Sequence, residues 1–446
     1  MKKIMALILC LTMVFALCAC SGTSAATETD KPAESDTPKE TPATAGSVYW
    51  LNSLPEADQV LQDIAKMYTE KTGVKVTVLS PEPGTYDEVL STEMDKSYAP
   101  TVFVIGDQAA MDIWGDFCYD LTGTPVAEEL STDIYNFYDD FGGLCAIGCG
   151  YECNGIIVNK ALLQQAGHSV EEITNFDSLK AVAEDIHARA EELGFDAFTS
   201  SGMSPDSSWR FTGNLANLEY YYESLDDPLA WEQIPAQIKG TYMGNFKNLW
   251  DLYINNSAAE PSALAAGGFD AKAEFLKGQA VFYSQGSGEW SSLQEQGMNA
   301  GDLTMIPYYC GVAGEERAGL SCGTDNCWAV NAEASDEEIQ ATLDFMYWCV
   351  TDPDASGALV EAFGAMPYKQ AAEPTNPFLA KAKAYIAAGN YIMPYIASFQ
   401  PNADSYREAL VSAMNQYDAD PTDENWELVR AAFVDGWAEQ YKAIYG

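Results

Sequence analysis

The sequence predicts an α/β protein of two lobes, with the chain crossing between the lobes more than once. Strands and helices alternate at short spacing between residues 48 and 105, which favours a mostly parallel sheet covered by helices. Beyond residue 160 helices predominate, and a strand returns at 327–331 before a helix at 336–350. A chain of 446 residues is long enough to form two or more domains.

The first lobe begins with an apolar strand at Val48–Leu51. Pro55 opens a helix that runs to about Lys71, and Gly73 is expected to stop it. The alternation then continues with a strand at 74–79, a helix at 86–94 and a strand at 102–105 that ends at Gly106-Asp107-Gln108 before another helix.

The Gly-rich, apolar stretch 142–160, GGLCAIGCGYECNGIIVNK, contains a single acid, Glu152. The β-branched run at 155–158 is typical of a buried strand, and a helix follows Asn159-Lys160. A carboxylate in such a strand must be paired, hydrogen-bonded or directed into a cleft, because burying it unpaired costs several kcal/mol. A satisfied structural acid is the alternative interpretation of Glu152.

The second half predicts a different mixture of elements. Its last part, 376–445, reads as almost wholly helical, with breaks near Met393-Pro394 and Asp420-Pro421. Before this tail we expect helices at 177–193, 211–222, 245–253 and 271–276, and strands at 280–283 and 303–307.

The charge balance excludes whole classes of partner. The chain has 66 acidic and 23 basic residues, a formal net charge of -43. Nucleic acid is excluded as a partner, because binding its phosphates requires clustered Lys and Arg. An anionic membrane surface would also repel the protein.

The first 20 residues predict export and lipidation. Lys2-Lys3 and a short apolar run precede Leu17-Cys18-Ala19-Cys20-Ser21, which resembles the lipobox of bacterial lipoproteins and implies a lipid on Cys20. A plain cleaved secretory signal is the alternative, and it would also place the protein outside the cytoplasm. Residues 21–46 lack aromatics and periodicity, so we expect a disordered tether that holds the folded part near the outer face of the membrane.

The cysteines do not predict a metal site or a cofactor. Cys145, Cys149 and Cys153 are spaced by four and lack the paired spacing of zinc sites, and the chain has only two histidines. An exported protein can form disulfides, but their pairing stays open. Eight cysteines follow Cys20, namely Cys118, Cys145, Cys149, Cys153, Cys310, Cys322, Cys327 and Cys349.

A series of modest motifs extends over nearly the whole chain after the tether. They are Val48-Tyr49-Trp50-Leu51-Asn52, the Thr69–Val76 element, the Tyr151–Lys160 segment, Phe275–Phe282, Glu289-Trp290, and Phe363-Gly364 with Pro367-Tyr368-Lys369. In their order and spacing they resemble the extracellular solute-binding proteins of ABC importers, specifically their carbohydrate-binding family 1.

The resemblance implies a two-lobe fold of the periplasmic-binding-protein type, the type II Venus flytrap, with three hinge crossings. These are expected near 151–154, 321–325 and 365–368. The lobes would be 47–151 plus 325–364 and 152–324 plus 365–446. A sugar or oligosaccharide would bind between them and pass to the permease subunits of an ABC importer. The protein would act as a monomer without enzymatic activity, and only its lipid anchor would contact the membrane.

The resemblance also implies ligand contacts at matching positions. Carboxylates and amides bind sugar hydroxyls, while aromatic rings cover the flat C–H faces of the sugar. Pro205 and Trp209 match an element that supplies an aromatic wall, and Tyr391 or Tyr395 would close the site from the C-terminal helices. The expected ligand-binding residues are Asn52, Asp107, Gln108, Glu152, Trp209, Glu289, Trp290 and Tyr395.

A surface-anchored glycoside hydrolase is the alternative function, because such enzymes also use aromatic walls and paired acids. The acids are too numerous for any pair of them to be informative. Gly319-Leu320-Ser321-Cys322-Gly323 matches the nucleophile elbow of α/β-hydrolases. That fold needs a histidine after the serine, whereas both histidines of this chain precede Ser321, so the motif is coincidental.

Overall fold

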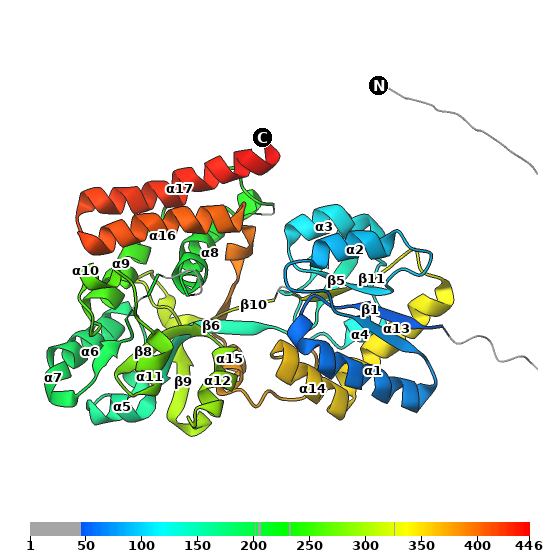
Figure 1. Cartoon of the computed structure of the whole chain (residues 1–446), viewed down its shortest axis with the longest axis horizontal. Coiled ribbons are helices and arrows are strands. Elements are labelled where there is room, and N and C mark those ends of the chain that lie inside the picture. Colours follow the sequence, from blue (N-terminus) through cyan, green and yellow to red (C-terminus); the bar gives the residue numbers. More distant parts are fainter. Residues whose placement is uncertain (1–45, 201, 204–206, 232, 325) are drawn as a thin grey trace, which may run out of the picture. The chain divides into compact units, whose positions relative to one another are not determined.

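Two six-stranded sheets form the framework of the protein (Figure 1). The computed structural model describes residues 46–446 except 201, 204–206, 232 and 325. The predicted signal peptide, the lipidation site Cys20 and all of the predicted tether but its last residue therefore lie outside the described residues. Among the residues that are described, no helix combines the length and apolarity needed to cross a bilayer.

The first sheet is parallel on one side and antiparallel on the other. Its strand order is β2-β1-β3-β11-β5-β4, and β1 runs parallel to both β2 and β3. The expected parallel sheet is thus correct for these three strands only. β11 enters from the other half of the chain and runs antiparallel to both of its neighbours. The strands are β1 (Val48–Leu51), β2 (Val76–Leu79), β3 (Val102–Ile105), β4 (Phe137–Tyr138), β5 (Leu144–Gly148) and β11 (Cys327–Val330).

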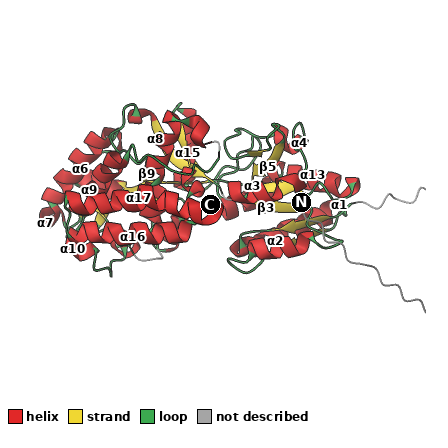
Figure 2. Cartoon of the chain, turned by 90° about the horizontal axis from the view of Figure 1, so that it is seen from above, coloured by secondary structure: helices red, strands yellow, loops and turns green. Residues whose placement is uncertain are grey.

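Helices cover both faces of this sheet because its central strands are apolar on both sides. Along β1, Val48 and Trp50 pack into one core cluster and Leu51 into another. Figure 2 shows helices on either side of the strands. One face packs against α1 (Asp58–Thr72), α13 (Asp336–Thr351) and α14 (Pro353–Phe363), and the other against α2 (Tyr86–Met94) and α3 (Gln108–Trp114).

The second sheet is built around β6, which starts at Glu152. Its strand order is β12-β10-β6-β8-β7, and β9 also pairs with β6. All three partners of β6 run antiparallel to it, whereas β12 is a parallel edge strand. The strands are β6 (Glu152–Asn159), β7 (Asp196–Phe198), β8 (Ala280–Gly286), β9 (Leu303–Ile306), β10 (Ala318–Gly323) and β12 (Tyr391–Pro394).

Helices also enclose the second sheet on two sides. The C-terminal pair α16 and α17 packs lengthwise and lies over α8 (Figure 1). The helices of the larger core cluster are α5 (Lys160–Gln165), α6 (Phe176–Ala188), α8 (Asn217–Asp226), α9 (Met243–Asn255), α16 (Ala403–Ala419) and α17 (Asp423–Tyr445). The helices of the smaller cluster are α11 (Ala271–Leu276), α12 (Glu289–Glu295) and α15 (Pro377–Ala387).

Local signals in the sequence fix several helix ends. α1 ends at Thr72, immediately before the predicted stop Gly73. Asn159 caps α5, because its side chain accepts a hydrogen bond from the backbone N–H of Leu162. A reciprocal capping box opens α13, with the side chains of Ser335 and Glu338 each bonded to the other's backbone N–H.

Three connections link the first sheet and its helices with the second. β5 leads into β6 through residues 149–151, β10 leads into β11 through 324–326, and α14 leads into α15 through 364–376. The first and third connections are paired, because Tyr151 and Ala365 exchange two backbone hydrogen bonds of 2.7 and 3.0 Å.

The structure corrects some expectations about the second half. The break near Met393-Pro394 is the strand β12, so the tail is less helical than predicted. The strands β7 and β10 were not predicted, because each is short and lacks a clear alternation. The helix expected at 177–193 is interrupted at Arg189. Pairing with neighbouring strands decides such short segments more than their own propensity does.

Buried carboxylates are a feature of the second half. Asp418 is fully buried, accepts a 2.9 Å hydrogen bond from the indole N–H of Trp250, and has no partner for Oδ2 among the described residues. Burial raises the pKa of Asp418 to about 7. Burial, and then the neighbouring Glu223, raises the pKa of Glu219 to about 8. Both acids therefore keep a proton to higher pH in the folded protein than in the unfolded chain.

We predict that Asp418→Asn flattens the pH dependence of stability. Between about pH 4 and pH 7 the folded protein holds a proton on Asp418 that the unfolded chain has released, so stability falls as the pH rises. In the parent protein, Asp418 lowers the free energy of unfolding between pH 4 and pH 8. In Asp418→Asn this contribution is absent, so the difference between the free energies at pH 8 and pH 4 should be more favourable to folding by about 2–4 kcal/mol than in the parent. Urea unfolding at the two pH values measures the effect.

The matched control is Asp435→Asn, which changes an exposed acid on α17. It should leave the pH dependence as it is in the parent protein. An equal pH slope in Asp418→Asn and the parent would show that Asp418 is ionised in the folded state.

Candidate ligand-binding site

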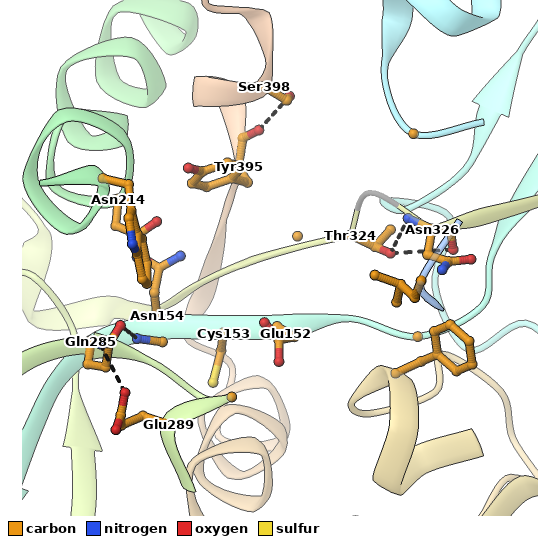
Figure 3. A pocket seen from close by; sticks show the side chains of 18 of the residues that line it. Glu152, Cys153, Asn154, Asn214, Gln285, Glu289, Thr324, Asn326, Tyr395 and Ser398 are labelled. Atoms are coloured by element: carbon orange, nitrogen blue, oxygen red, sulfur yellow. Dashed lines mark hydrogen bonds between the residues drawn. The ribbon is translucent and has the colours of Figure 1, made fainter. Parts of the chain in front are cut away.

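A cavity of about 780 Å³ is lined by residues of both halves of the chain (Figure 3). Asp107, Asn326 and Phe363 belong to the first sheet and its helices, whereas most of the lining comes from the second half. Carboxyl ends and starts of strands supply many of these side chains, where an open α/β sheet presents polar groups. From the second half the lining includes Glu152, Asn154, Trp209, Asn214, Lys272, Gln285, Glu289, Ser292, Tyr395, Ser398 and Arg407.

Glu152 stands at the first position of β6 and is exposed, whereas the other seven residues of that strand are buried. The side chain lines the cavity. Its backbone is fixed on both sides of the strand, since residue 152 pairs with Gly323 of β10 and the next residue bonds to Ser287. The rigid strand thus holds the carboxylate at the cavity wall.

Two amide side chains of the cavity lining are buried and have unused acceptors. Asn154 is 9% exposed and Asn326 is 3% exposed, and the side-chain oxygen of each has no hydrogen-bond partner among the described residues. Asn326 is held by backbone and side-chain bonds to Thr324 and Ser53. A buried carbonyl without a donor costs about 1–3 kcal/mol, so each oxygen favours a ligand that brings an O–H or N–H group.

Gln285 and Glu289 form a fixed polar network on the floor of the cavity (Figure 3). The side-chain amide of Gln285 donates to the Glu289 carboxylate at 3.1 Å, and its oxygen accepts from the backbone N–H of Gly286 at 2.9 Å. Lys272 forms a 2.7 Å ion pair with Glu289. The charge of Lys272 is therefore neutralised inside the site.

Three aromatic residues line the cavity, Phe363 of the first half and Trp209 and Tyr395 of the second, and the structure positions the last two differently. Trp209 is 38% exposed and precedes a π-helical segment, Arg210–Leu215; π-helical turns frequently occur at functional sites. Tyr395 lies against two glycines. A Cβ atom at Gly323 would stand 2.5 Å from Tyr395 Cβ, and one at Gly213 would stand 2.8 Å from the phenolic oxygen. The ring can occupy this place only because both positions lack a side chain.

Arg407 on α16 is a cation of the site that the sequence did not single out. Its Nε donates a 2.6 Å hydrogen bond to the side-chain oxygen of Gln400. Gln400 is buried and donates in turn to the Thr212 carbonyl and the Tyr220 hydroxyl. This chain of bonds orients the guanidinium beside Gly213 at the cavity wall. Only the scarcity of basic residues in so acidic a sequence could have drawn attention to Arg407.

Comparisons with known proteins place the chain. A family model for bacterial extracellular solute-binding proteins matches residues 63–388. The chain belongs to this family. Its members are solute-binding proteins rather than enzymes. A search of curated proteins finds no match.

Solved structures of solute-binding proteins share the fold. Apo RafE from Streptococcus pneumoniae is 17% identical, with a TM-score of 0.68 over 90% of this chain and 100% of that chain. A probable secreted solute-binding lipoprotein from Streptomyces coelicolor is 18% identical, with a TM-score of 0.66 over 90% and 100%. RafE in complex with raffinose is 16% identical, with a TM-score of 0.61 over 88% and 99%. These likenesses confirm the predicted fold class.

The cavity of this solute-binding protein brings together five of the eight residues that the sequence predicts as ligand contacts. They are Asp107, Glu152, Trp209, Glu289 and Tyr395. Asp107 also caps α3, since its carboxylate accepts a 2.8 Å hydrogen bond from the backbone N–H of Ala110. Contact with a ligand stays a prediction for all five. Pro205, expected beside Trp209, lies outside the described residues.

The structure places the other three predicted residues outside the cavity lining. Asn52 is fully buried and serves a turn, bonding to Leu54 and Ser80. Gln108 lies on α3 and bonds to Asp112 one turn later. Trp290 is 7% exposed and packs edge-to-face on Phe378 in the smaller core cluster of the second half. The motif fixed the position of Trp290 in the chain but not the direction of its side chain.

Arg210, which follows Trp209 in the chain, has a structural role in this solute-binding protein. It is 3% exposed, donates to the carbonyls of Ser207 and Ser284, and lies over the rings of Phe211 and Tyr283. The described residues contain no group of metal-ligating side chains.

We predict opposite phenotypes for the two tryptophans. Trp290→Ala should lower the free energy of unfolding by about 3–5 kcal/mol, because it leaves a cavity in the core, and should change ligand affinity less than threefold. Trp209→Ala should leave stability within about 0.5 kcal/mol and weaken binding by about 1–3 kcal/mol through lost contact with the ligand. Urea unfolding and calorimetric titration measure the two effects, and the reverse pattern would contradict the assignment.

Proposed function

We propose that this protein binds a neutral saccharide in the cavity between its two halves and delivers it to the permease of an ABC importer. The observation that carries the proposal is the pair of buried amide oxygens on Asn154 and Asn326, which lie on opposite halves and lack donors among the described residues. A polyol can donate a hydroxyl to each. RafE, one of the structural neighbours, has been solved in complex with raffinose, an oligosaccharide.

The chemistry of the remaining lining supports a sugar. Glu152, Glu289 and Gln285 offer charged and amide acceptors for hydroxyl groups. The rings of Trp209 and Tyr395 offer flat apolar surface for C–H faces. The cavity volume of about 780 Å³ lies within the usual range for ligand pockets and leaves room for more than a single sugar ring.

Charge in the cavity argues for a neutral ligand. Among the described residues of the lining, four side chains are acidic, Glu56, Asp107, Glu152 and Glu289, and two are basic, Lys272 and Arg407. Lys272 is already paired with Glu289. An anionic ligand would therefore meet net repulsion, in addition to that of the chain's overall charge of -43.

We further propose that 47–151 plus 325–364 and 152–324 plus 365–446 act as the two lobes and close on the ligand. The three connections between the sheets would supply the hinges. Ligand can favour the closed form only through contacts that are stronger there, so the acceptors on the two lobes are the groups that would couple binding to closure. The closed form would then be recognised by the permease.

In this proposal the protein releases its ligand unchanged. Ser321, the serine of the apparent nucleophile elbow, lies 1% exposed within β10 and accepts a hydrogen bond from Asn217, so it cannot act as a nucleophile toward a ligand in the cavity. A glycoside hydrolase remains the alternative that incubation with oligosaccharides tests. We also propose that lipidation at Cys20 anchors a monomer to the outer face of the cell membrane.

The decisive experiment incubates the purified protein with a panel of end-labelled neutral oligosaccharides. We expect intact sugars after incubation and an increase in thermal stability with one class of them. Ligand at 100 times its dissociation constant should add about 2.7 kcal/mol to the free energy of unfolding. Shortened oligosaccharides would establish the hydrolase, and a stability increase with amino acids or peptides only would reject a saccharide ligand.

We predict that Glu152→Gln weakens binding of the identified sugar by about 1–3 kcal/mol without unfolding the protein, because a charge-assisted acceptor becomes a neutral one. Calorimetric titration measures the affinity. Glu295→Gln, an exposed acid at the end of α12 outside the cavity lining, is the matched control and should bind normally. Loss of the fold in Glu152→Gln would instead identify Glu152 as a structural acid.

A further inference from the structure

A second cavity, of about 680 Å³, lies in the second half of the chain away from the ligand-binding site. The strand β12 connects the two regions, since Tyr391 at its start lines this cavity and Tyr395, just beyond its end, lines the first. We call the second cavity the tyrosine groove and define it by Tyr221, Tyr222, Asp226, Tyr242, Asn245 and Tyr391.

The four tyrosine rings of the groove form a continuous wall. Tyr221 lies parallel to Tyr391 with ring centroids 6.0 Å apart, and meets Tyr222 edge-to-face at 5.1 Å. Tyr222 contacts Tyr242 at 5.5 Å. Because the rings pack on one another in a row, they form a wall rather than a cage around a point; Tyr221 and Tyr222 are buried in it, and Tyr242 and Tyr391 are its partly exposed rings.

Polar groups lie along this wall. The hydroxyls of Tyr222 and Tyr391 are 3.0 Å apart, and the Tyr242 hydroxyl donates to the Asp226 carboxylate at 3.0 Å. Asp226 is exposed, so its other acceptor positions face solvent. The side chain of Asn245 donates to the Cys310 carbonyl at 2.9 Å, which leaves its own oxygen available as an acceptor.

Three buried glutamates hold the groove in shape. Glu315, 4% exposed, accepts hydrogen bonds of 2.7 and 2.8 Å from the N–H groups of Cys310 and Gly311, in the loop that forms one side. Glu219 accepts from the N–H of Tyr242 at 3.0 Å, and Glu223 accepts from the N–H groups of residues 239–241. Fixed walls lower the entropy that the protein loses when a ligand binds.

We infer that the tyrosine groove is a second saccharide-binding site, independent of the cavity between the two halves. Stacked tyrosines offer apolar faces for sugar C–H groups and hydroxyls for sugar oxygens, while Asp226 and Asn245 offer acceptors. No Lys or Arg lines the groove in the described part of the chain, which argues against phosphates, carboxylates and other anions.

The same geometry argues against two further ligand classes, quaternary ammonium ions and purely apolar molecules. A quaternary ammonium ion is bound where ring faces converge, whereas these rings lie in a row. A purely apolar ligand would cover the exposed carboxylate of Asp226 and the side-chain oxygen of Asn245 without offering a donor to either. The inference does not rest on the proposed function, because the groove shares no lining residue with the other cavity.

The test uses the full chain with four linear hexasaccharides as probes, namely maltohexaose, cellohexaose, xylohexaose and mannohexaose. Saturation-transfer difference NMR detects weak binding, and titration gives the dissociation constant. Tyr242→Ala and Tyr391→Ala each remove a partly exposed ring of the wall, and Asp226→Asn removes the charge while keeping the shape. Tyr138→Ala, which removes an exposed ring from the edge strand β4 of the other sheet, is the matched control.

We expect at least one hexasaccharide to bind with two sites per chain, or with one site that Glu152→Gln does not affect. Each ring variant should weaken this binding at least tenfold and Asp226→Asn at least threefold, with unchanged melting temperatures in Asp226→Asn and Tyr138→Ala. Tyr138→Ala should bind normally.

Four results would overturn the inference. The first is that no hexasaccharide binds outside the cavity between the halves, and the second is that such binding is unchanged in the groove variants. The third and fourth are that the groove binds tetramethylammonium, or a proline-rich peptide, in place of sugars. If the ring variants unfold, Asp226→Asn decides the question by itself, and normal binding in that variant would count against the site.

Discussion

Backbone pairing of β6 is the constraint on which the rest of the site depends. The strand bonds to β8, β9 and β10 along its length, and seven of its eight residues are buried. Its first residue therefore has a fixed position at the cavity wall, beside the connection from the first sheet. β10 is fixed beside it and leads back to the first sheet through a second connection. One pairing thus sets both the place of Glu152 and the route of the chain between the halves.

Scarcity of positive charge is the second constraint. With 66 acidic and 23 basic residues, most carboxylates have no Lys or Arg available. Several buried glutamates accept hydrogen bonds from backbone N–H groups of loops instead, as Glu315 and Glu223 do. Other buried carboxyl groups, such as that of Asp418, have a pKa that burial raises. At the ligand-binding site, Lys272 forms an ion pair with Glu289 and Arg407 donates a hydrogen bond to Gln400.

These constraints connect the two cavities. The second half of the chain supplies most of the polar lining of the ligand-binding site and all described residues of the tyrosine groove lining. α8 contributes to the groove on one side, and its buried Tyr220 bonds to Gln400, which orients Arg407 on the other. A change in the packing of α8 would therefore be felt at both places.

The sequence by itself determined the family, the order of most elements and five members of the cavity lining. The elements follow from local signals, such as the apolar run of β1 and the helix stop at Gly73, whereas the family and the lining residues follow from the resemblance of the motifs, with Glu152 also marked as the lone acid of an apolar strand. Only the tertiary structure decided that Trp290 packs in a core, that Asn52 serves a turn and that β10 and β12 are strands. It alone brought Arg407, Asn154 and Asn326 to the cavity. The physical reason is that the direction of a side chain and the pairing of a short strand depend on neighbours distant in the sequence, and no local pattern records them.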